Sequence, residues 1–142
     1  MPHSDPVNWQ PISQMPLIAS MIDGALADIH EHLATLTQAK ARPHVLDDAT
    51  MDRSIRVHTE RMECVDIYAK QTGLWRTQRP SAAQMRELDR ISLQNQQLRM
   101  VTAEVLVLDE ELRKGTIERV LGMSDFELGI QAPIRAPSAV RR

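Results

Sequence analysis

Residues 81–114, SAAQMRELDRISLQNQQLRMVTAEVLVLDEELRK, form the longest part of the chain that contains neither Gly nor Pro. Ser81 and Gln84 occupy the positions of a capping box directly after Pro80, so the sequence predicts that a helix begins here. At 1.5 Å per residue, an unbroken helix as far as Lys114 is about 50 Å long, which is longer than a compact domain of this mass needs. We therefore expect one long helix around which the rest of the chain is organised.

Apolar residues repeat along this predicted helix at helical spacing and form a seam. The first part of the seam contains Leu88, Ile91, Asn95 and Leu98, and after a shortened step it continues as Val101, Val105, Leu108 and Leu112. A shortened step of this kind is how a coiled coil absorbs a stammer. Other apolar residues of the helix add more apolar surface than two shorter helices can cover. They are Leu93, Met100, Leu106 and Val107.

This excess of apolar surface predicts that a second copy of the chain completes the bundle, most simply in a twofold dimer. The predicted interface between copies is the middle of the seam, formed by Asn95, Leu98, Val101, Val105 and Leu108. One Asn in a coiled-coil core usually fixes the register or the number of partners. We therefore expect Asn95 to pair across the twofold axis.

Two shorter helices are predicted before the long one. Apolar residues from Leu17 to about Ala41 recur at steps of three and four, and Pro43 then breaks the pattern. Asp47 is a candidate N-cap for the second helix, and Gly73 is a candidate C-cap glycine. The sequence therefore predicts an all-α fold, in which an antiparallel helical hairpin and one long helix form a bundle of three main helices.

The segment after the long helix is expected to fold as one or two short helices. Gly115 is predicted to end the long helix, and Ser124 and Glu127 stand in capping-box positions further on. The predicted organisation has three parts: an extended Pro-rich arm over 1–16, one helical-bundle domain over 17–130, and a disordered basic tail over 131–142.

The stretch ALADIHEHLATL, residues 25–36, raises the question of a metal site, because two histidines flank one glutamate. His30 and His32 diverge on a helix, whereas chelation on one helical face needs a spacing of three or four residues. His32 falls on the apolar side of its helix, His58 lies on the seam of the next helix, and both are about equally far from the predicted bend. We therefore interpret His32 and His58 as a polar pair in the core. Two alternatives remain for these histidines: they form a metal or proton-linked site, or they do not contact each other.

Composition limits the class of protein. The chain has 142 residues, a formal net charge of −2 and a single cysteine, Cys64, so it cannot form a disulfide within itself. It contains no long apolar run, no basic segment followed by an apolar one at its start, and no phosphate-binding loop or nucleophile elbow. We therefore expect a cytoplasmic protein that is not an enzyme, with no cofactor, no metal, no catalytic residue and no membrane contact.

The leading functional interpretation is a non-catalytic helical interaction and oligomerisation module, whose partner is itself or another protein. A regulator of transcription or of other nucleic-acid machinery is the first alternative, and it rests on Arg76, Arg79, Arg86 and Arg90. Clustered arginines without interleaved aromatic residues are more often a solvated face, so nucleic acid is not the expected partner. A metal-dependent helical-bundle enzyme is the third interpretation, and it rests only on His32 and His58.

Overall fold

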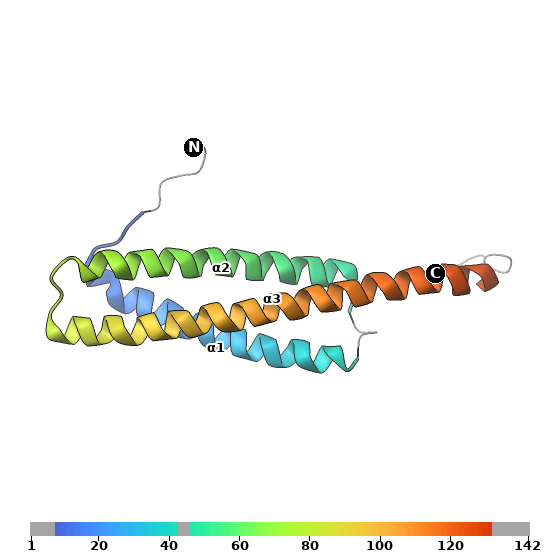
Figure 1. The fold of residues 1–142 in the computed structure, drawn as a ribbon, viewed down its shortest axis with the longest axis horizontal. Helices are drawn as coiled ribbons and strands as arrows, with labels where there is room; N and C mark the ends of the chain where they lie inside the picture. The colour runs from blue at the N-terminus through green and yellow to red at the C-terminus, as the bar shows by residue number, and fades with distance from the viewer. Residues whose placement is uncertain (1–7, 43–45, 132–142) are drawn as a thin grey trace.

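The computed structural model describes residues 8–42 and 46–131, with side chains described as far as Thr116. A short 3-10 turn, η1 (Ile12–Gln14), leads into α1 (Met15–Lys40), which is followed by α2 (Asp48–Arg76) and α3 (Ala82–Gln131). No strand occurs among the described residues. The fold is therefore an all-α bundle of three helices, as the sequence predicts (Figure 1).

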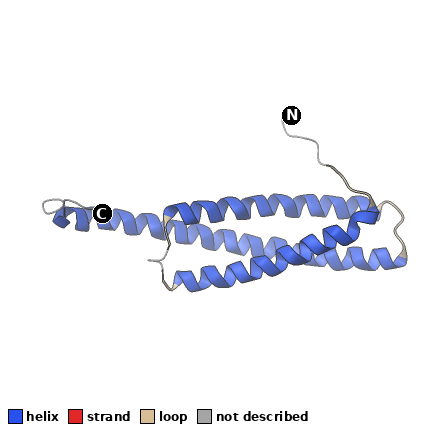
Figure 2. Cartoon of the chain, turned by 180° about the vertical axis from the view of Figure 1, so that it is seen from behind, coloured by secondary structure: helices blue, strands red, loops and turns tan. Residues whose placement is uncertain are grey.

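The long helix α3 is the common partner of the other two. Both α1 and α2 pack along α3, whereas the packing of α1 against α2 is slight in comparison. The two shorter helices run antiparallel and diverge toward the end at which α1 stops and α2 begins, as both views show (Figures 1 and 2). The hairpin is therefore held together mainly through α3.

The core consists of two clusters of buried side chains along α3. The cluster near the start of α1 includes Ile22, Trp75 and Leu88, and the other includes Met51 and Val105. Each of these five side chains is completely buried, so each contributes roughly 1.5–3 kcal/mol of transfer free energy or more. Burial against α3 is thus what fixes the positions of α1 and α2.

The start of α1 differs from the predicted extended arm. The helix begins at Met15, with Pro16 in its first turn, where proline is tolerated. The backbone N–H of Gln10 donates to Gln71 Oε1 at 2.7 Å, and the indole N–H of Trp75 donates to the carbonyl of Gln10 at 2.9 Å. Residues 8–14 are therefore attached to α2. The rest of the predicted arm, residues 1–7, lies outside the described residues.

The two predicted helix starts are confirmed by their side-chain caps. The carboxylate of Asp47 accepts the backbone N–H of Thr50 at 2.7 Å. Before α3, the backbone N–H of Gln84 donates to Ser81 Oγ at 3.1 Å, and the N–H of Ser81 donates to Gln84 Oε1 at 2.9 Å. Both motifs satisfy backbone donors that a helix start leaves without intrahelical partners.

The predicted ends at glycine are wrong in both helices. α2 continues through Gly73 to Arg76, because Trp75 is completely buried in the core. α3 continues through Gly115, because Thr116 is buried and its hydroxyl donates to Asp48 Oδ1 at 2.7 Å. Glycine inside a helix costs about 1 kcal/mol relative to alanine, which a single buried contact of this kind can offset.

The predicted short C-terminal helices are also wrong, because α3 is one helix as far as Gln131. The backbone of Ser124 and Glu127 is helical, so these residues do not start a new helix. Beyond Thr116, α3 projects past the ends of α1 and α2 (Figure 1). Gln131 belongs to α3, and residues 132–142 of the predicted tail lie outside the described residues.

The buried side of α3 follows an unbroken pattern, so the predicted shortened step is wrong. Its positions alternate steps of three and four without interruption: Leu88, Ile91, Asn95, Leu98, Thr102, Val105, Asp109, Leu112 and Thr116. Four of these residues are polar: Asn95, which the predicted seam includes, and Thr102, Asp109 and Thr116, which a pattern built from apolar residues passes over. Val101 flanks this row and is also buried.

Candidate functional site

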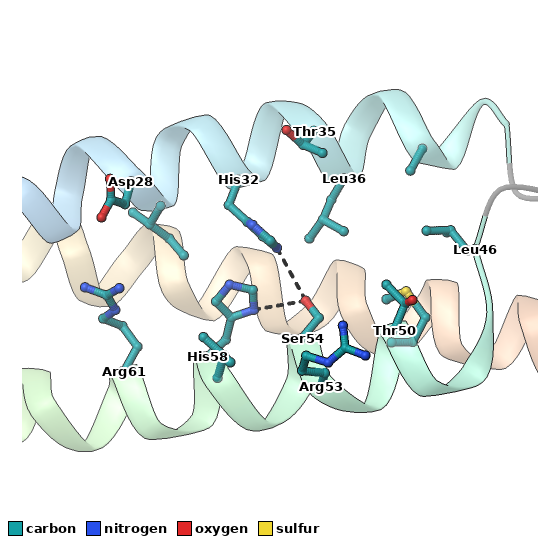
Figure 3. A pocket seen from close by; sticks show the side chains of 14 residues that line it. Asp28, His32, Thr35, Leu36, Leu46, Thr50, Arg53, Ser54, His58 and Arg61 are labelled. Atoms are coloured by element: carbon teal, nitrogen blue, oxygen red, sulfur yellow. Dashed lines mark hydrogen bonds between the residues drawn. The ribbon is translucent and has the colours of Figure 1, made fainter.

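An open groove lies between α1 and α2, where the two helices diverge (Figure 3). Its volume is about 340 Å³ and its walls are mainly apolar, with Ile29 and Leu36 on α1 and Met51 and Val57 on α2. Val57 is 46% exposed, whereas Met51 is completely buried. The groove exists because α1 and α2 each pack on α3 and leave the space between them unfilled.

The structure brings His32 and His58 together at this groove. Their ring centroids are 4.5 Å apart, with the rings edge to face at an interplanar angle of 63°. Ser54 lies between them, with its Oγ 3.4 Å from His32 Nε2 and 3.3 Å from His58 Nδ1. Figure 3 shows the two imidazoles reaching toward each other from opposite walls, with Ser54 beside them and a hydrogen bond from it to each ring. The predicted polar pair therefore includes a hydroxyl group that links the two rings.

Asp109 completes this polar cluster from α3 and was missed by the sequence analysis. Its Oδ2 lies 2.8 Å from His58 Nδ1, and its Oδ1 accepts the Ser54 hydroxyl at 2.7 Å. The side chain of Asp109 is completely buried, and that of His58 is 5% exposed. The signal that could have found Asp109 is its place in the alternating row of buried positions on α3.

One assignment of protons satisfies three of the four polar contacts in the cluster, all except that of Ser54 Oγ with His58 Nδ1. With a proton on His32 Nε2, that nitrogen donates to Ser54 Oγ, whose own hydroxyl donates to Asp109 Oδ1. With a proton on His58 Nδ1, that nitrogen donates to Asp109 Oδ2. Each oxygen of Asp109 then accepts one hydrogen bond, which offsets part of the cost of burying the carboxyl group.

Burial lowers the pKa of His32, the nearby His58 lowers it further, and Asp109 acts in the opposite direction. The net effect is that the folded protein favours the neutral form of His32. A neutral ring can donate from Nε2 to Ser54 while its other nitrogen remains an acceptor. The pKa shift therefore agrees with the hydrogen-bond assignment.

The set of Ser54, His58 and Asp109 has the composition of a hydrolase triad, but its geometry is different. In a triad, the carboxylate and the serine bind opposite nitrogens of the imidazole, so the ring can take the serine proton. Here both groups lie against the same atom, His58 Nδ1, and the serine hydroxyl donates to Asp109. His58 is therefore not placed as a general base for Ser54.

The chemistry of metal binding also does not fit the described part of the chain. No group of three or more His, Cys, Asp or Glu side chains that could hold a metal ion occurs among the described residues. The nearest approach to such a group, His32 with His58 and Asp109, is arranged through hydrogen bonds to Ser54. The arrangement joins three helices and engages one nitrogen of each ring, His32 Nε2 and His58 Nδ1, with protein atoms.

The residues predicted to form the interface between copies lie inside a single chain. Leu98 and Val105 are completely buried, Val101 is buried, and Leu108 is partly buried against the same core cluster. Asn95 is buried, and its Nδ2 donates to the backbone carbonyl of Val65 at 3.0 Å. These five residues are covered by α1 and α2 and do not form an exposed seam, so the interface assignment is corrected. Asn95 contacts α2 of its own chain instead of pairing across an axis.

Part of the predicted basic patch is neutralised. Arg76 Nη1 lies 2.9 Å from a carboxylate oxygen of Asp89, and Arg90 contacts both Asp23 and Glu87 at 2.9 and 2.8 Å. The other two arginines of the patch, Arg79 and Arg86, are exposed. Two of its four guanidinium groups are therefore already paired with acidic side chains.

Comparisons of the chain with protein-family models, curated proteins and solved structures return no match. Within the described residues, no helix combines the length and apolar character needed to cross a bilayer. The features of the molecule that bear on function are the groove, the polar cluster and the exposed surfaces of the three helices.

Proposed function

We propose that the protein is a non-catalytic helical module that assembles with copies of itself. The observation that carries this proposal is the length of α3, which is 50 residues, against 26 for α1 and 29 for α2. Its last part, residues 117–131, projects beyond both shorter helices (Figure 1) and is called the overhang from here on.

The composition of the overhang supports a partner. Seven of its residues are apolar: Ile117, Val120, Leu121, Met123, Phe126, Leu128 and Ile130. Isolated helices shorter than about 12–15 residues are marginal in water, and most helical stability in proteins comes from packing an apolar face. A helix that packs beside the overhang would supply this stabilisation, and among the described residues no helix of the same chain runs there (Figure 1).

The exposed surface of α3 gives further support. Leu93, Met100 and Val107 are 62%, 68% and 61% exposed and lie seven residues apart, so they share one side of the helix. These residues belong to the excess apolar surface predicted from the sequence, and α1 and α2 leave them uncovered. Two apolar surfaces, this row and the groove, are therefore available to a second copy.

The proposal of a non-catalytic role is supported by the polar cluster. Ser54 and Asp109 meet the same nitrogen of His58, so His58 is not placed to activate the Ser54 hydroxyl. The single cysteine, Cys64, is free and exposed, which suits a reducing compartment such as the cytoplasm. The nucleic-acid and metal alternatives gain no specific support, because two patch arginines are ion-paired and no metal-ligand group occurs in the described region.

The test is the molar mass of the full chain in solution, measured by light scattering after size-exclusion chromatography at tens of micromolar. Self-assembly as a dimer gives twice the 16.1 kDa of one chain. A protein that has the mass of a single chain at this concentration would overturn the proposed function. The measurement does not depend on which surface of the molecule forms the interface.

A further inference from the structure

We propose that the overhang of one copy binds in the groove between α1 and α2 of a second copy, and that the exchange is reciprocal. This inference rests on the proposed self-assembly and assigns its interface. Each copy then presents a groove lined by α1 and α2, both of which pack on α3, and the overhang of its partner becomes the fourth helix of the bundle. Four-helix bundles are a stable way for helices with one apolar side to bury that side.

The lengths of the two surfaces agree. The groove extends from Thr50 to Arg61 on α2 and from Asp28 to Ala39 on α1. At 1.5 Å per residue both walls are about 17 Å long, and the overhang, residues 117–131, is about 21 Å long. A helix of the length of the overhang therefore fills the groove from end to end.

The positions of the two surfaces also agree. The groove opens at the end of the bundle where α1 stops and α2 begins, and the overhang projects from that same end (Figure 1). A twofold axis that runs beside α3 at the level of Thr116 would place the overhang of one copy antiparallel to α3 of the other, and hence parallel to its α2. With the midpoints of overhang and groove aligned, position 126 lies beside Val57.

The charges of the two surfaces are complementary. Arg53 and Arg61 line the groove on α2, and neither forms a salt bridge with a described residue, while Asp28 lines the groove on α1. Two positive charges and one negative charge give this surface a net charge of +1. The charged residues of the overhang are Glu118, Arg119, Asp125 and Glu127, with a net charge of −2. Opposite charges of this kind favour the docked arrangement and its orientation.

The sequence of the overhang continues the pattern by which α3 packs on its own chain. Beyond Thr116, the alternating steps of three and four reach positions 119, 123, 126 and 130. Three of these positions are apolar, namely Met123, Phe126 and Ile130. The row of positions that α1 and α2 cover in one copy thus extends into the segment proposed to enter the groove of the other. Its polar exception is Arg119.

The exposed row of Leu93, Met100 and Val107 provides the rival interface, because it could pair with itself in an antiparallel dimer of α3 helices. It is a single row of three side chains, and stable interfaces bury about 1,200–2,000 Å² in total. A reciprocal exchange forms two copies of the overhang contact in each dimer. The groove is therefore the interface that the structure favours.

The experiment compares the concentration dependence of molar mass for the full chain and four variants of it. Val57→Glu places a charge in the groove, and Phe126→Asp places one in the overhang. Ile67→Glu is a matched control on α2 outside the groove, at a side chain that is 39% exposed. Met100→Glu tests the rival row. We expect Val57→Glu and Phe126→Asp to raise the dissociation constant of the dimer roughly tenfold or more. The dissociation constants of Ile67→Glu and Met100→Glu should stay within about twofold of the wild-type value.

A mixture of the two weakened variants separates a lost interface from a lost fold. A mixed pair of Val57→Glu and Phe126→Asp chains retains one intact groove with one intact overhang, so we expect the mixture to associate more tightly than either variant alone. A dimeric wild type whose association is weakened only by Met100→Glu would overturn this inference and leave the proposed self-assembly standing. Unchanged association in both Val57→Glu and Phe126→Asp would overturn it as well, whereas a monomeric wild type would overturn the proposed function itself.

Discussion

His58 Nδ1 lies 2.8 Å from Asp109 Oδ2, and this contact joins α2 to α3 at a point where the carboxyl group is completely buried. Ser54 supplies the only other hydrogen bond to Asp109 among the described residues. A buried carboxyl group is costly unless its oxygens accept hydrogen bonds, so the stability of the bundle depends on keeping these donors in place. The main effect of the contact is therefore to supply a hydrogen-bond donor to a buried carboxyl group, which offsets the cost of burying it.

Replacing His58 with leucine should lower the free energy of unfolding by roughly 3–5 kcal/mol, because it leaves the buried carboxyl group of Asp109 with only Ser54 as a donor. The double change His58→Leu and Asp109→Leu should recover much of this loss, since no buried acid then remains. Urea unfolding at pH 7 measures both effects. A double variant no more stable than the single variant would contradict the explanation.

The stability of the protein should fall as the pH is lowered below about 6.5, the ordinary pKa of histidine. Burial and the neighbouring His58 lower the pKa of His32 in the folded state, and Asp109 opposes them. The unfolded chain therefore binds a proton more readily than the folded chain, and acid favours unfolding. We expect a lower urea midpoint at pH 5 than at pH 7.5. His32→Gln should reduce this difference, and His30→Gln, at an exposed position of α1, should leave it unchanged.

The changes Gly73→Ala and Gly115→Ala should each stabilise the protein by about 0.5–1 kcal/mol. Both glycines lie inside helices, neither has a positive φ angle, and a Cβ atom at either position would meet nothing within 4 Å. Thermal unfolding followed by circular dichroism measures the effect. If either glycine were a helix end, as its local sequence suggests, alanine would destabilise the protein there instead.

The main features of the fold follow from local signals in the sequence. The helix starts at Asp47 and Ser81 depend on side chains within three residues of the backbone groups that they cap, so they can be found without knowledge of the tertiary structure. The closeness of His32 and His58 follows from their helical positions and their distance from the bend. These predictions needed only periodicity and capping chemistry.

Other features depend on contacts between helices, and the sequence pattern alone misplaces them. The helices α2 and α3 continue beyond Gly73 and Gly115, because Trp75 and Thr116 are each buried against a distant part of the chain. A search for apolar residues does not find Asp109, because this buried residue is polar and its partners, Ser54 and His58, lie on another helix. The groove was not predicted, because it depends on the divergence of α1 from α2, which no local signal encodes.

Reversing charge on the groove should weaken self-association by roughly three- to tenfold, since docking would then bring like charges together. The variant Arg53→Glu/Arg61→Glu changes the groove, and Asp125→Lys/Glu127→Lys changes the overhang. We expect each pair of changes alone to weaken the dimer and their combination in one chain to restore it, as measured by sedimentation equilibrium at low salt. Arg56→Glu, on α2 but outside the groove lining, is the control for net charge. If the chain with all four changes associated more weakly than the chains with either pair of changes alone, the docking of the overhang in the groove would be contradicted.

A disulfide bond between the groove of one copy and the overhang of another would show directly that the overhang docks in the groove. In chains that carry Cys64→Ser, one protein receives Val57→Cys, and a second protein, distinguishable by size, receives Phe126→Cys. Because each chain has one cysteine, a mixed bond forms only between copies whose two positions approach closely. After mixing and mild oxidation, we predict a mixed dimer that is sensitive to reductant and far more abundant than with Ile67→Cys in place of Val57→Cys. Equal yields from the two mixtures would contradict the docking of the overhang in the groove.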